Sequence, residues 1–299
     1  MFDHQQQIFG DPVDEADRRD RMLQDRDWTV PAPGSLASRF PAPSGELAMV
    51  ALGDPTDPRV VLVPGVSGSK EDFVLMLPLL AEAGFYVQAF DMAGQYESGR
   101  AGPGPGGSYD YDLFVDDLIA ILDSGAPAHL LGYSFAGTVA QLVLARRPDL
   151  VRSLTLLATP PEPGNGFRGV RGLGPFTFLA GGRVGAALMT WGIRTNKNHV
   201  PPLRLDFVRM RFDHTSRRSM EDIIRLMKRA PDVRDQVAAS RVPKLVAVGS
   251  HDLWPTALHA EFAERIGARL VVYPTGHSPC ETAPHQLARD MIAMFSSAE

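Results

Sequence analysis

The stretch LLGYSFAG, residues 130–137, places a serine between small neighbours directly after a run of apolar residues. The run AHLL, residues 128–131, lacks the alternation of a half-exposed strand and is typical of a strand covered on both faces. From Ala136 to Pro148 the apolar residues recur at helical spacing. The stretch therefore predicts a strand, a sharp turn and a helix, with Ser134 in the turn.

Such a turn needs an unusual backbone at its apex, because the helix begins almost where the strand ends. Ser134 is therefore expected at positive φ, with small residues on either side. Gly132 and Ala136 meet that demand, and Gly137 lets the helix approach a neighbouring strand. The pattern is a G-x-S-x-G nucleophile elbow with alanine in the last place. A Gly-Ser turn without chemistry would look the same locally, so partners for the serine must decide.

Composition limits the class of protein and its partners. With 299 residues and 44% hydrophobic content, the chain can bury the core of one large α/β domain or two small ones. Its formal net charge of −5 argues against nucleic acid as a partner. A single cysteine, Cys280, excludes an internal disulfide and a multi-cysteine metal site. The first residues contain neither a basic leader nor an apolar segment, so a cytoplasmic location is expected.

Strand-like and helix-like segments alternate along the chain. Strands are expected at residues 35–40, 46–52, 59–65, 85–90, 128–132, 152–158, 243–249 and 269–274, with helices at 70–84, 109–125 and after the serine turn. The third strand is nearly all apolar and is expected in the centre of the sheet. This order predicts an α/β fold with a mostly parallel central sheet and helices on both faces.

The alternation stops between the sixth and seventh strands. A structureless loop of that length is improbable, so residues 160–240 are predicted to form a helical insertion. The core then comprises residues 35–159 and 241–299, and residues 1–34 form a charged N-terminal arm. The apolar segment 173–193 is long enough to cross a membrane, but its central arginine and its glycines argue against a span.

The arm and the insertion carry opposite charge. Residues 1–34 contain four arginines and eight acidic residues, whereas residues 161–240 contain fourteen lysines and arginines and seven acidic residues. A solvated basic face would explain this. The sharper hypothesis is that the arm lies against the insertion, on its own subunit or a neighbour's, which leaves a homo-oligomer open. Ile8, Phe9 and Trp28 are the candidate anchors of the arm.

An acid and a base for the serine are expected beyond the carboxyl ends of other strands, where functional groups gather in parallel sheets. The strand KLVAVG runs into SHDLWP and places Asp252 there, and RLVVYP runs into TGHSP and places His277 there. Their order along the chain, serine, aspartate, histidine, is that of α/β-type triads. Alternatively, His277 is a surface loop residue and Asp252 a turn or cap residue.

The chemistry assigns each group a role. Neutral His277 would remove the Ser134 proton, and Asp252 would fix the imidazole tautomer and stabilise the imidazolium. The backbone N–H groups of Phe135 and Val66 are the predicted oxyanion-hole donors. No GxGxxG sequence follows the first strand, and the chain contains neither a Walker sequence nor HExxH, which argues against nucleotide and zinc sites. We leave the lone histidines His214 and His251 and the thiol of Cys280 out of the site.

Five motifs together resemble the serine α/β-hydrolases of the cap-bearing esterase and lipase-like kind, across about residues 35–299. They are LVPGVSGS at 62–69, FDMAGQYESG at 90–99, HLLGYSFAG at 129–137, AVGSHD at 247–252 and GHSPCETAP at 276–284. Ser134 disfavours the members with an aspartate nucleophile, such as haloalkane dehalogenases and epoxide hydrolases. Two residues depart from the family pattern: Pro64 stands where a histidine usually precedes the oxyanion glycine, and Ala136 replaces the last glycine of the elbow.

The resemblance implies an α/β-hydrolase fold with a helical cap and hydrolysis of a carboxylic ester or related acyl bond through an acyl-enzyme. Such a carboxylesterase-like enzyme needs no cofactor and no metal. The expected substrate is a small molecule with an apolar acyl or ring portion, facing the cap segments 174–182 and 187–192. A thioesterase, a carbon–carbon bond hydrolase acting on diketones, a cofactor-free perhydrolase and a non-catalytic ligand-binding protein remain alternatives.

Overall fold

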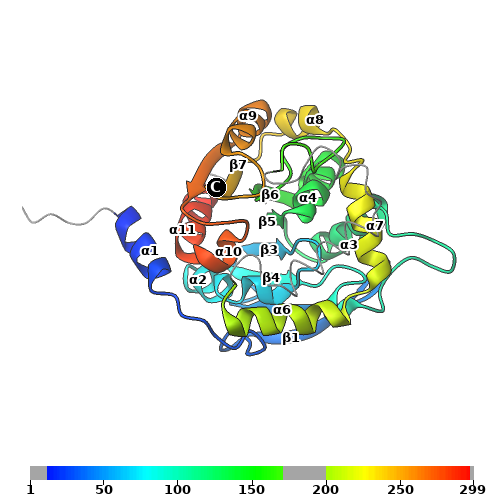
Figure 1. Ribbon diagram of the computed structural model, residues 1–299, viewed down its shortest axis with the longest axis horizontal. Helices are drawn as coiled ribbons and strands as arrows, with labels where there is room; N and C mark the ends of the chain where they lie inside the picture. Colours follow the sequence, from blue (N-terminus) through cyan, green and yellow to red (C-terminus); the bar gives the residue numbers. More distant parts are fainter. Residues whose placement is uncertain (1–11, 171–199, 297–299) are drawn as a thin grey trace, which may run out of the picture.

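The computed structural model describes residues 12–170 and 200–296, which build a single eight-stranded sheet flanked by helices (Figure 1). The strands are β1 (Leu36–Ala42), β2 (Gly45–Leu52), β3 (Arg59–Val63), β4 (Tyr86–Phe90), β5 (Ala128–Tyr133), β6 (Val151–Leu157), β7 (Lys244–Gly249) and β8 (Arg269–Tyr273). Their order across the sheet is β1-β2-β4-β3-β5-β6-β7-β8. The pairs β1–β2 and β2–β4 are antiparallel, and the other five pairs are parallel. The predicted α/β class is confirmed.

The helices cover both faces of the sheet. One face packs against α3 (Tyr111–Asp123), α4 (Phe135–Arg146), α8 (Arg234–Ala239) and α9 (Thr256–Ile266), and the other against α2 (Met76–Glu82) and α11 (Pro284–Phe295). Short helical turns η1 (Lys70–Phe73), η2 (Tyr96–Ser98), η3 (Pro148–Leu150) and α10 (Pro279–Thr282) lie in the connections. The loop after α2 turns at Gly84, whose φ of 87° suits the glycine expected there.

The central strand β3 shows why its sequence is apolar throughout. Val61 and Val63 pack with α3 and α4, whereas Val60 and Leu62 pack with α2 and α11. Successive side chains of a strand point to opposite faces, so a strand covered on both sides must be apolar at every core position. Burying each of these side chains contributes about 1.5–3 kcal/mol. The apolar core thus holds the strand ends in a fixed array.

The insertion between β6 and β7 contains α6 (Pro202–His214), α7 (Arg217–Met227) and α8. On α7, Met220, Ile223, Ile224 and Met227 recur at helical spacing and are buried. Residues 171–199 lie outside the described part, and with them the segments 173–193, 174–182 and 187–192. In the ranges that are described, we find no helix with the length and apolar character needed to cross a membrane.

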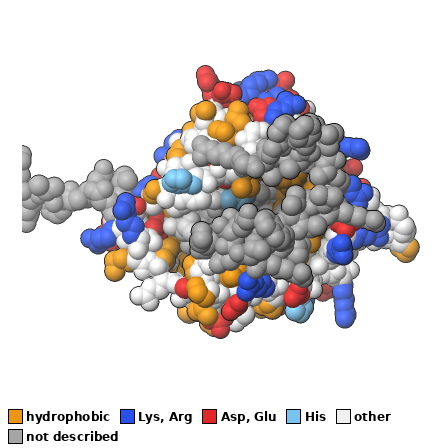
Figure 2. Space-filling model, viewed as in Figure 1, with side chains coloured by type: hydrophobic (Ala, Val, Ile, Leu, Met, Phe, Trp, Pro, Cys, Tyr) orange, Lys and Arg blue, Asp and Glu red, His pale blue; other side chains and the backbone are white. Residues whose placement is uncertain are grey.

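The N-terminal arm lies on the core and on the insertion. Helix α1 (Pro12–Arg21) packs on α11, where Asp20 accepts a hydrogen bond from the backbone N–H of His285 at 2.9 Å. Ile8 and Phe9 lie outside the described residues. Figure 2 shows side chains of both charges around the rim of one face of the molecule, so this face carries no purely basic rim.

The arm reaches α6 through two residues. Asp25 accepts a hydrogen bond from the backbone N–H of Leu203 at 2.7 Å, and the Trp28 ring lies 4.3 Å from the guanidinium carbon of Arg204. Trp28 is buried in the same core as α2 and α11. The contact expected between the arm and the insertion is therefore present within one chain.

Candidate active site

Ser134 forms the apex of the turn between β5 and α4, with φ 53° and ψ −119°. This confirms the positive φ expected there. A Cβ atom on Gly132 would lie 2.5 Å from the carbonyl oxygen of Ala136, and one on Gly137 would lie 1.9 Å from Oγ1 of Thr159. Both glycines are therefore required for the helix to begin where it does, and the elbow presents the serine side chain beyond the strand end.

The structure brings the three predicted triad residues together. Nε2 of His277 lies 3.2 Å from Oγ of Ser134, and Nδ1 of His277 lies 2.5 Å from Oδ1 of Asp252. The three residues lie just after the carboxyl ends of β5, β7 and β8, where the sequence predicted them. The His277 side chain is 24% exposed, whereas the Asp252 side chain has no exposed surface. The His277 ring is thus partly accessible from solvent and the Asp252 carboxylate is not.

The environment of Asp252 keeps its carboxylate ionised. Oδ1 also accepts the backbone N–H of Leu253 at 2.7 Å, and Oδ2 accepts from Nε2 of His259 at 3.0 Å. Burial alone would raise the pKa of Asp252, but the hydrogen bonds from His259 and His277 outweigh it and lower the pKa to about 2. Because a carboxylate only accepts, Nδ1 of His277 carries the hydrogen, and its Nε2 faces Ser134 as an acceptor.

The loop after β3 lies against the elbow. A Cβ atom on Gly65 would lie 3.1 Å from Cβ of Ser134, and the backbone N–H of Gly68 donates to the carbonyl of Gly65 at 3.0 Å, which closes a tight turn around Val66. Phe135 is the first residue of α4, and the first N–H groups of a helix have no intrahelical acceptor. Both predicted oxyanion donors therefore belong to segments beside Ser134, and their role stays a prediction.

Comparison with known proteins agrees with this architecture. Residues 58–181 match the family described as alpha/beta hydrolase fold. The enol-lactonase of Burkholderia xenovorans has a TM-score of 0.70 at 20% identity, covering 87% of this chain and 100% of its own. The meta-cleavage product hydrolase of Pseudomonas fluorescens has a TM-score of 0.68 at 20% identity, with 88% and 98% covered. The chain has the α/β-hydrolase fold.

Two relatives are more similar in sequence over shorter stretches. The human serine hydrolase-like protein is 30% identical over 132 residues, which is 43% of this chain and 64% of the relative. The pimeloyl-[acyl-carrier protein] methyl ester esterase of Neisseria meningitidis is 35% identical over 101 residues, which is 34% of this chain and 36% of the relative. The chain therefore matches between about one third and two thirds of the length of these relatives.

One residue at this site, His259, was not predicted from the sequence. His259 lies in the first turn of α9 and bonds the oxygen of Asp252 that His277 does not use. Its position seven residues after Asp252, at the start of the helix that follows the acid loop, was the available signal. That its side chain is completely buried could not be deduced from the sequence.

A hydrogen bond between Tyr133 and Ser278 fixes the loop that contains His277. The hydroxyl of Tyr133, directly before the serine, lies 2.8 Å from Oγ of Ser278, directly after the histidine. Burial raises the pKa of Tyr133 well above its usual value, so the phenol stays protonated. The bond ties the end of β5 to the loop after β8 and so limits the relative movement of Ser134 and His277.

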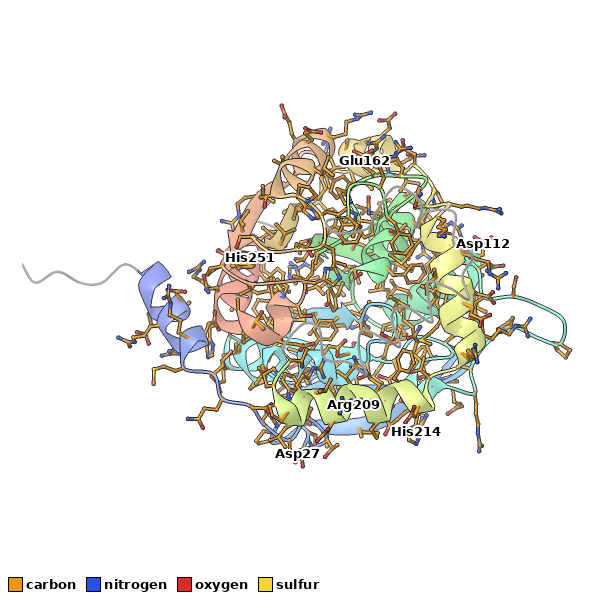
Figure 3. All side chains as sticks on the ribbon, viewed as in Figure 1. Asp27, Asp112, Glu162, Arg209, His214 and His251 are labelled. Atoms are coloured by element: carbon orange, nitrogen blue, oxygen red, sulfur yellow. The ribbon has the colours of Figure 1, made fainter. Side chains whose placement is uncertain are left out.

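The residues left out of the site have other partners. Nδ1 of His214 lies 2.8 Å from the carbonyl of Met210, and Nδ1 of His251 lies 3.0 Å from Oγ of Ser250. Figure 3 shows His214 and His251 in separate parts of the molecule. The Cys280 thiol is buried, and this burial raises its pKa well above its usual value. A thiolate nucleophile at Cys280 is therefore disfavoured.

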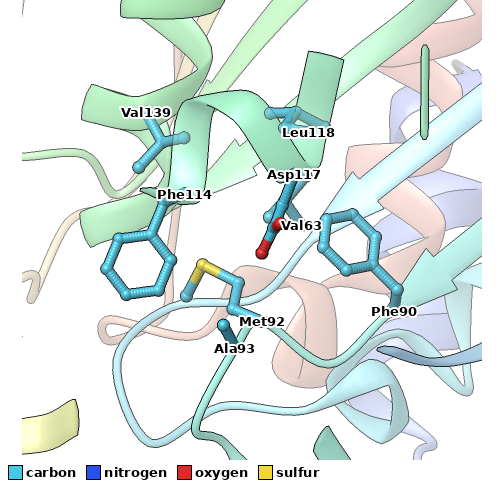
Figure 4. Close-up of a pocket in the computed structure, with 8 residues that line it drawn as sticks. All are labelled: Val63, Phe90, Met92, Ala93, Phe114, Asp117, Leu118 and Val139. Atoms are coloured by element: carbon cyan, nitrogen blue, oxygen red, sulfur yellow. The ribbon is translucent and has the colours of Figure 1, made fainter. Parts of the chain in front are cut away.

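A separate small space lies in the core beside residues of α3 and α4 (Figure 4). It is lined by Val63, Phe90, Met92, Ala93, Phe114, Asp117, Leu118 and Val139 and has no volume that would hold a water molecule. It contains none of the triad residues. Over residues 12–170 and 200–296, no group of three or more His, Cys, Asp or Glu side chains is arranged to hold a metal ion.

Proposed function

We propose that this protein hydrolyses a carboxylic ester, or a related acyl bond, through an acyl-enzyme formed on Ser134. The observation that carries the proposal is the unbroken series of contacts from Oγ of Ser134 through both ring nitrogens of His277 to Asp252. A serine hydroxyl becomes a competent nucleophile only when a base accepts its proton, and the base must be held in one tautomer. The series of contacts meets both conditions.

Acylation follows from this geometry. Oγ of Ser134 attacks the acyl carbon while its proton passes to Nε2 of His277, and the imidazolium is stabilised by the Asp252 carboxylate 2.5 Å away. The developing oxyanion would be held by the N–H groups of Phe135 and Val66. The bond to the alcohol then breaks, and the alcohol leaves with the proton from Nε2. The product is a Ser134 ester of the acyl group.

Deacylation uses the same groups in the reverse direction. A water molecule gives one proton to Nε2 of His277 as its oxygen bonds to the acyl carbon, and the bond to Oγ of Ser134 then breaks. The proton returns to Oγ and the carboxylic acid leaves. The atoms balance with water as the only co-reactant, so this sequence of steps calls for no cofactor.

The proposed cap determines which acyl compounds fit the site. Helices α6 and α7 belong to the segment 160–240, which we propose to act as a cap over a small substrate with an apolar acyl or ring portion. Thioesters and diketones would meet the same nucleophile and base, so the geometry favours no one of these acyl compounds over the others. A panel of matched esters, thioesters and diketones compared by kcat/KM would rank them.

The first test of the proposal is labelling and turnover. We expect wild-type protein to be labelled on Ser134 by a fluorophosphonate and to hydrolyse p-nitrophenyl acetate. Ser134→Ala should lose the label and more than about a thousandfold in kcat, because nucleophile and base act as a unit. Ser296→Ala, the same change at an exposed position after α11, is the matched control. Turnover by Ser134→Ala at a few per cent of the wild-type rate would refute the assignment of the nucleophile.

A further inference from the structure

We infer that His259 is a positioning residue for the reaction: it holds one oxygen of Asp252 so that the other stays directed at His277. The inference rests on the proposed function, since it gives Asp252 the role of the triad acid. Nε2 of His259 lies 3.0 Å from Oδ2, and Nδ1 of His277 lies 2.5 Å from Oδ1. The acid is thus held between two histidines, one on each oxygen.

The ring of His259 has a single hydrogen-bond partner among the described residues. The side chain is completely buried, and its Nδ1 has no partner in that part of the chain. Burying an imidazole with one nitrogen unpartnered costs free energy, so we expect the other nitrogen to make a compensating contact. That contact is Asp252. Because the carboxylate only accepts, Nε2 carries the hydrogen, and Nδ1 is left as the acceptor.

The surroundings of His259 fix the direction of this hydrogen bond. The ring meets the Trp254 ring edge-on, at 6.2 Å between centroids and 88° between planes. Trp254 is itself anchored, because its Nε1 donates to the carbonyl of Gly166 at 2.9 Å, and its ring lies 5.8 Å from that of His277. Trp254 therefore contacts both histidines that bond to Asp252.

Loss of His259 would leave Oδ2 as a carboxylate oxygen with no donor among the described residues. Such an oxygen favours rotation of the carboxylate, and two oxygens would then compete for the single N–H of His277. The rotation would loosen the hold on the imidazole without touching the substrate. We therefore expect a loss in the chemical step with little change in binding.

The test compares His259→Phe, which keeps a planar ring of similar size, with His259→Gln, which keeps an N–H donor. The readouts are the rate constant for fluorophosphonate labelling of Ser134, kcat and KM for p-nitrophenyl acetate, and the melting temperature. We expect His259→Phe to lower the labelling rate and kcat by about tenfold to a hundredfold, with KM unchanged within about twofold. His259→Gln should restore the rate to within about threefold of wild type.

The matched control is His129→Phe, a second buried histidine, which bonds Oγ of Ser153 and stacks on Phe295. It should alter the melting temperature alone. Equal rates for His259→Phe and wild type would overturn the inference. So would a His259→Gln rate as low as that of His259→Phe, since packing would then explain both. If His259→Phe does not fold, His259→Gln decides: a loss beyond about tenfold in a folded protein contradicts a donor role.

The two proposals fail in different ways. Wild-type protein that a fluorophosphonate does not label would refute the proposed function, and the role of His259 with it. Labelled wild-type protein together with an equally labelled His259→Phe variant would refute the role of His259 alone.

Discussion

Asp72 and Asp117 are equally buried, each 2% exposed, yet their carboxyl groups behave in opposite ways. Burial raises the pKa of both. At Asp72, the guanidinium groups of Arg211 and Arg204 outweigh burial and lower the pKa, whereas at Asp117 burial prevails and raises the pKa to about 6. The partners of Asp117 are the N–H and hydroxyl of Ser44. At Asp117, two neutral donors do not compensate for the hydration that the carboxylate loses on burial. At Asp72, two guanidinium cations do.

The two carboxylates also differ in what they hold together. Asp72 lies in η1, just after the loop that contains Val66, and contacts Arg204 and Arg211 of α6. Arg204 also pairs with Glu281, four residues after His277. This ionic cluster, Asp72, Arg204, Arg211 and Glu281, therefore connects α6 with the two loops beside Ser134. Asp117, in contrast, connects α3 with the turn before β2.

The largest expected effect on stability is that of Asp72→Asn. The change leaves Arg211 and Arg204 buried with Glu281 as the remaining charged partner in the cluster, and breaking a buried ion pair on one side costs about 3–5 kcal/mol. We expect the free energy of unfolding to fall by about 3 kcal/mol in urea denaturation. The control is Asp206→Asn on the exposed side of α6. A loss no larger than that of the control would show that the cluster does not hold α6 to the core.

Asp117→Asn should have a smaller effect with a distinctive pH dependence. Because the pKa is raised in the folded protein, protonated Asp117 stabilises the fold. That contribution is complete below the pKa of Asp117 in the unfolded chain, about 4, and is lost as the pH rises through the folded-state pKa of about 6. Asparagine carries no charge, so the variant should be about 1–3 kcal/mol more stable than wild type at about pH 8 and equal to it at about pH 4.

Urea denaturation across this pH range measures the Asp117 effect. The control is Asp116→Asn, the exposed neighbour on α3. The differences from wild type are compared within one pH, because Asp91, whose pKa burial raises to about 7, adds a pH dependence of its own to every variant. A constant difference between Asp117→Asn and wild type over the whole range would contradict a raised pKa.

How far the sequence predicts the molecule depends on the range of the contacts involved. The elbow was predictable because Gly132, Ser134 and Gly137 act within six residues of one another. Asp252 and His277 were predictable because parallel strands bring their carboxyl ends to one edge. The role of His259 was not predictable, since a solvated histidine at the same position would have the same sequence. The partners of Arg204 and Arg211 were also hidden, because they lie far away along the chain.

The contact between the arm and the insertion was predicted only in part. Opposite charges predicted its contact with the insertion, and Trp28 is one of the anchors expected. Over residues 12–34 and 200–240, however, the contact is not a set of surface ion pairs. Asp25 instead accepts the backbone N–H groups of Leu203 at 2.7 Å and of Arg204 at 3.3 Å. A count of charges cannot distinguish a carboxylate that pairs with a lysine or arginine side chain from one that accepts hydrogen bonds from the N–H groups at a helix N-terminus.

The smallest expected effect is that of Asp25→Ala, an exposed carboxylate at the start of α6. Helix α6 begins at Pro202 after Pro201, and neither proline can cap it with a side chain, so the cap comes from the arm. Losing such a cap costs about 1 kcal/mol, less in high salt because part of the effect is attraction to the helix dipole.

Deleting the whole arm would also remove the buried Trp28 and so could not isolate the contact between Asp25 and α6. The measurement is urea denaturation at low and high salt, together with KM for a bulky ester, beside Asp27→Ala, which removes a nearby arm carboxylate that bonds Thr29. We expect a stability loss larger than that of Asp27→Ala at low salt, a smaller gap at high salt, and a shift in KM if the arm restrains α6. Equal losses for the two variants at both salt concentrations would show that the arm rests on α6 without stabilising it.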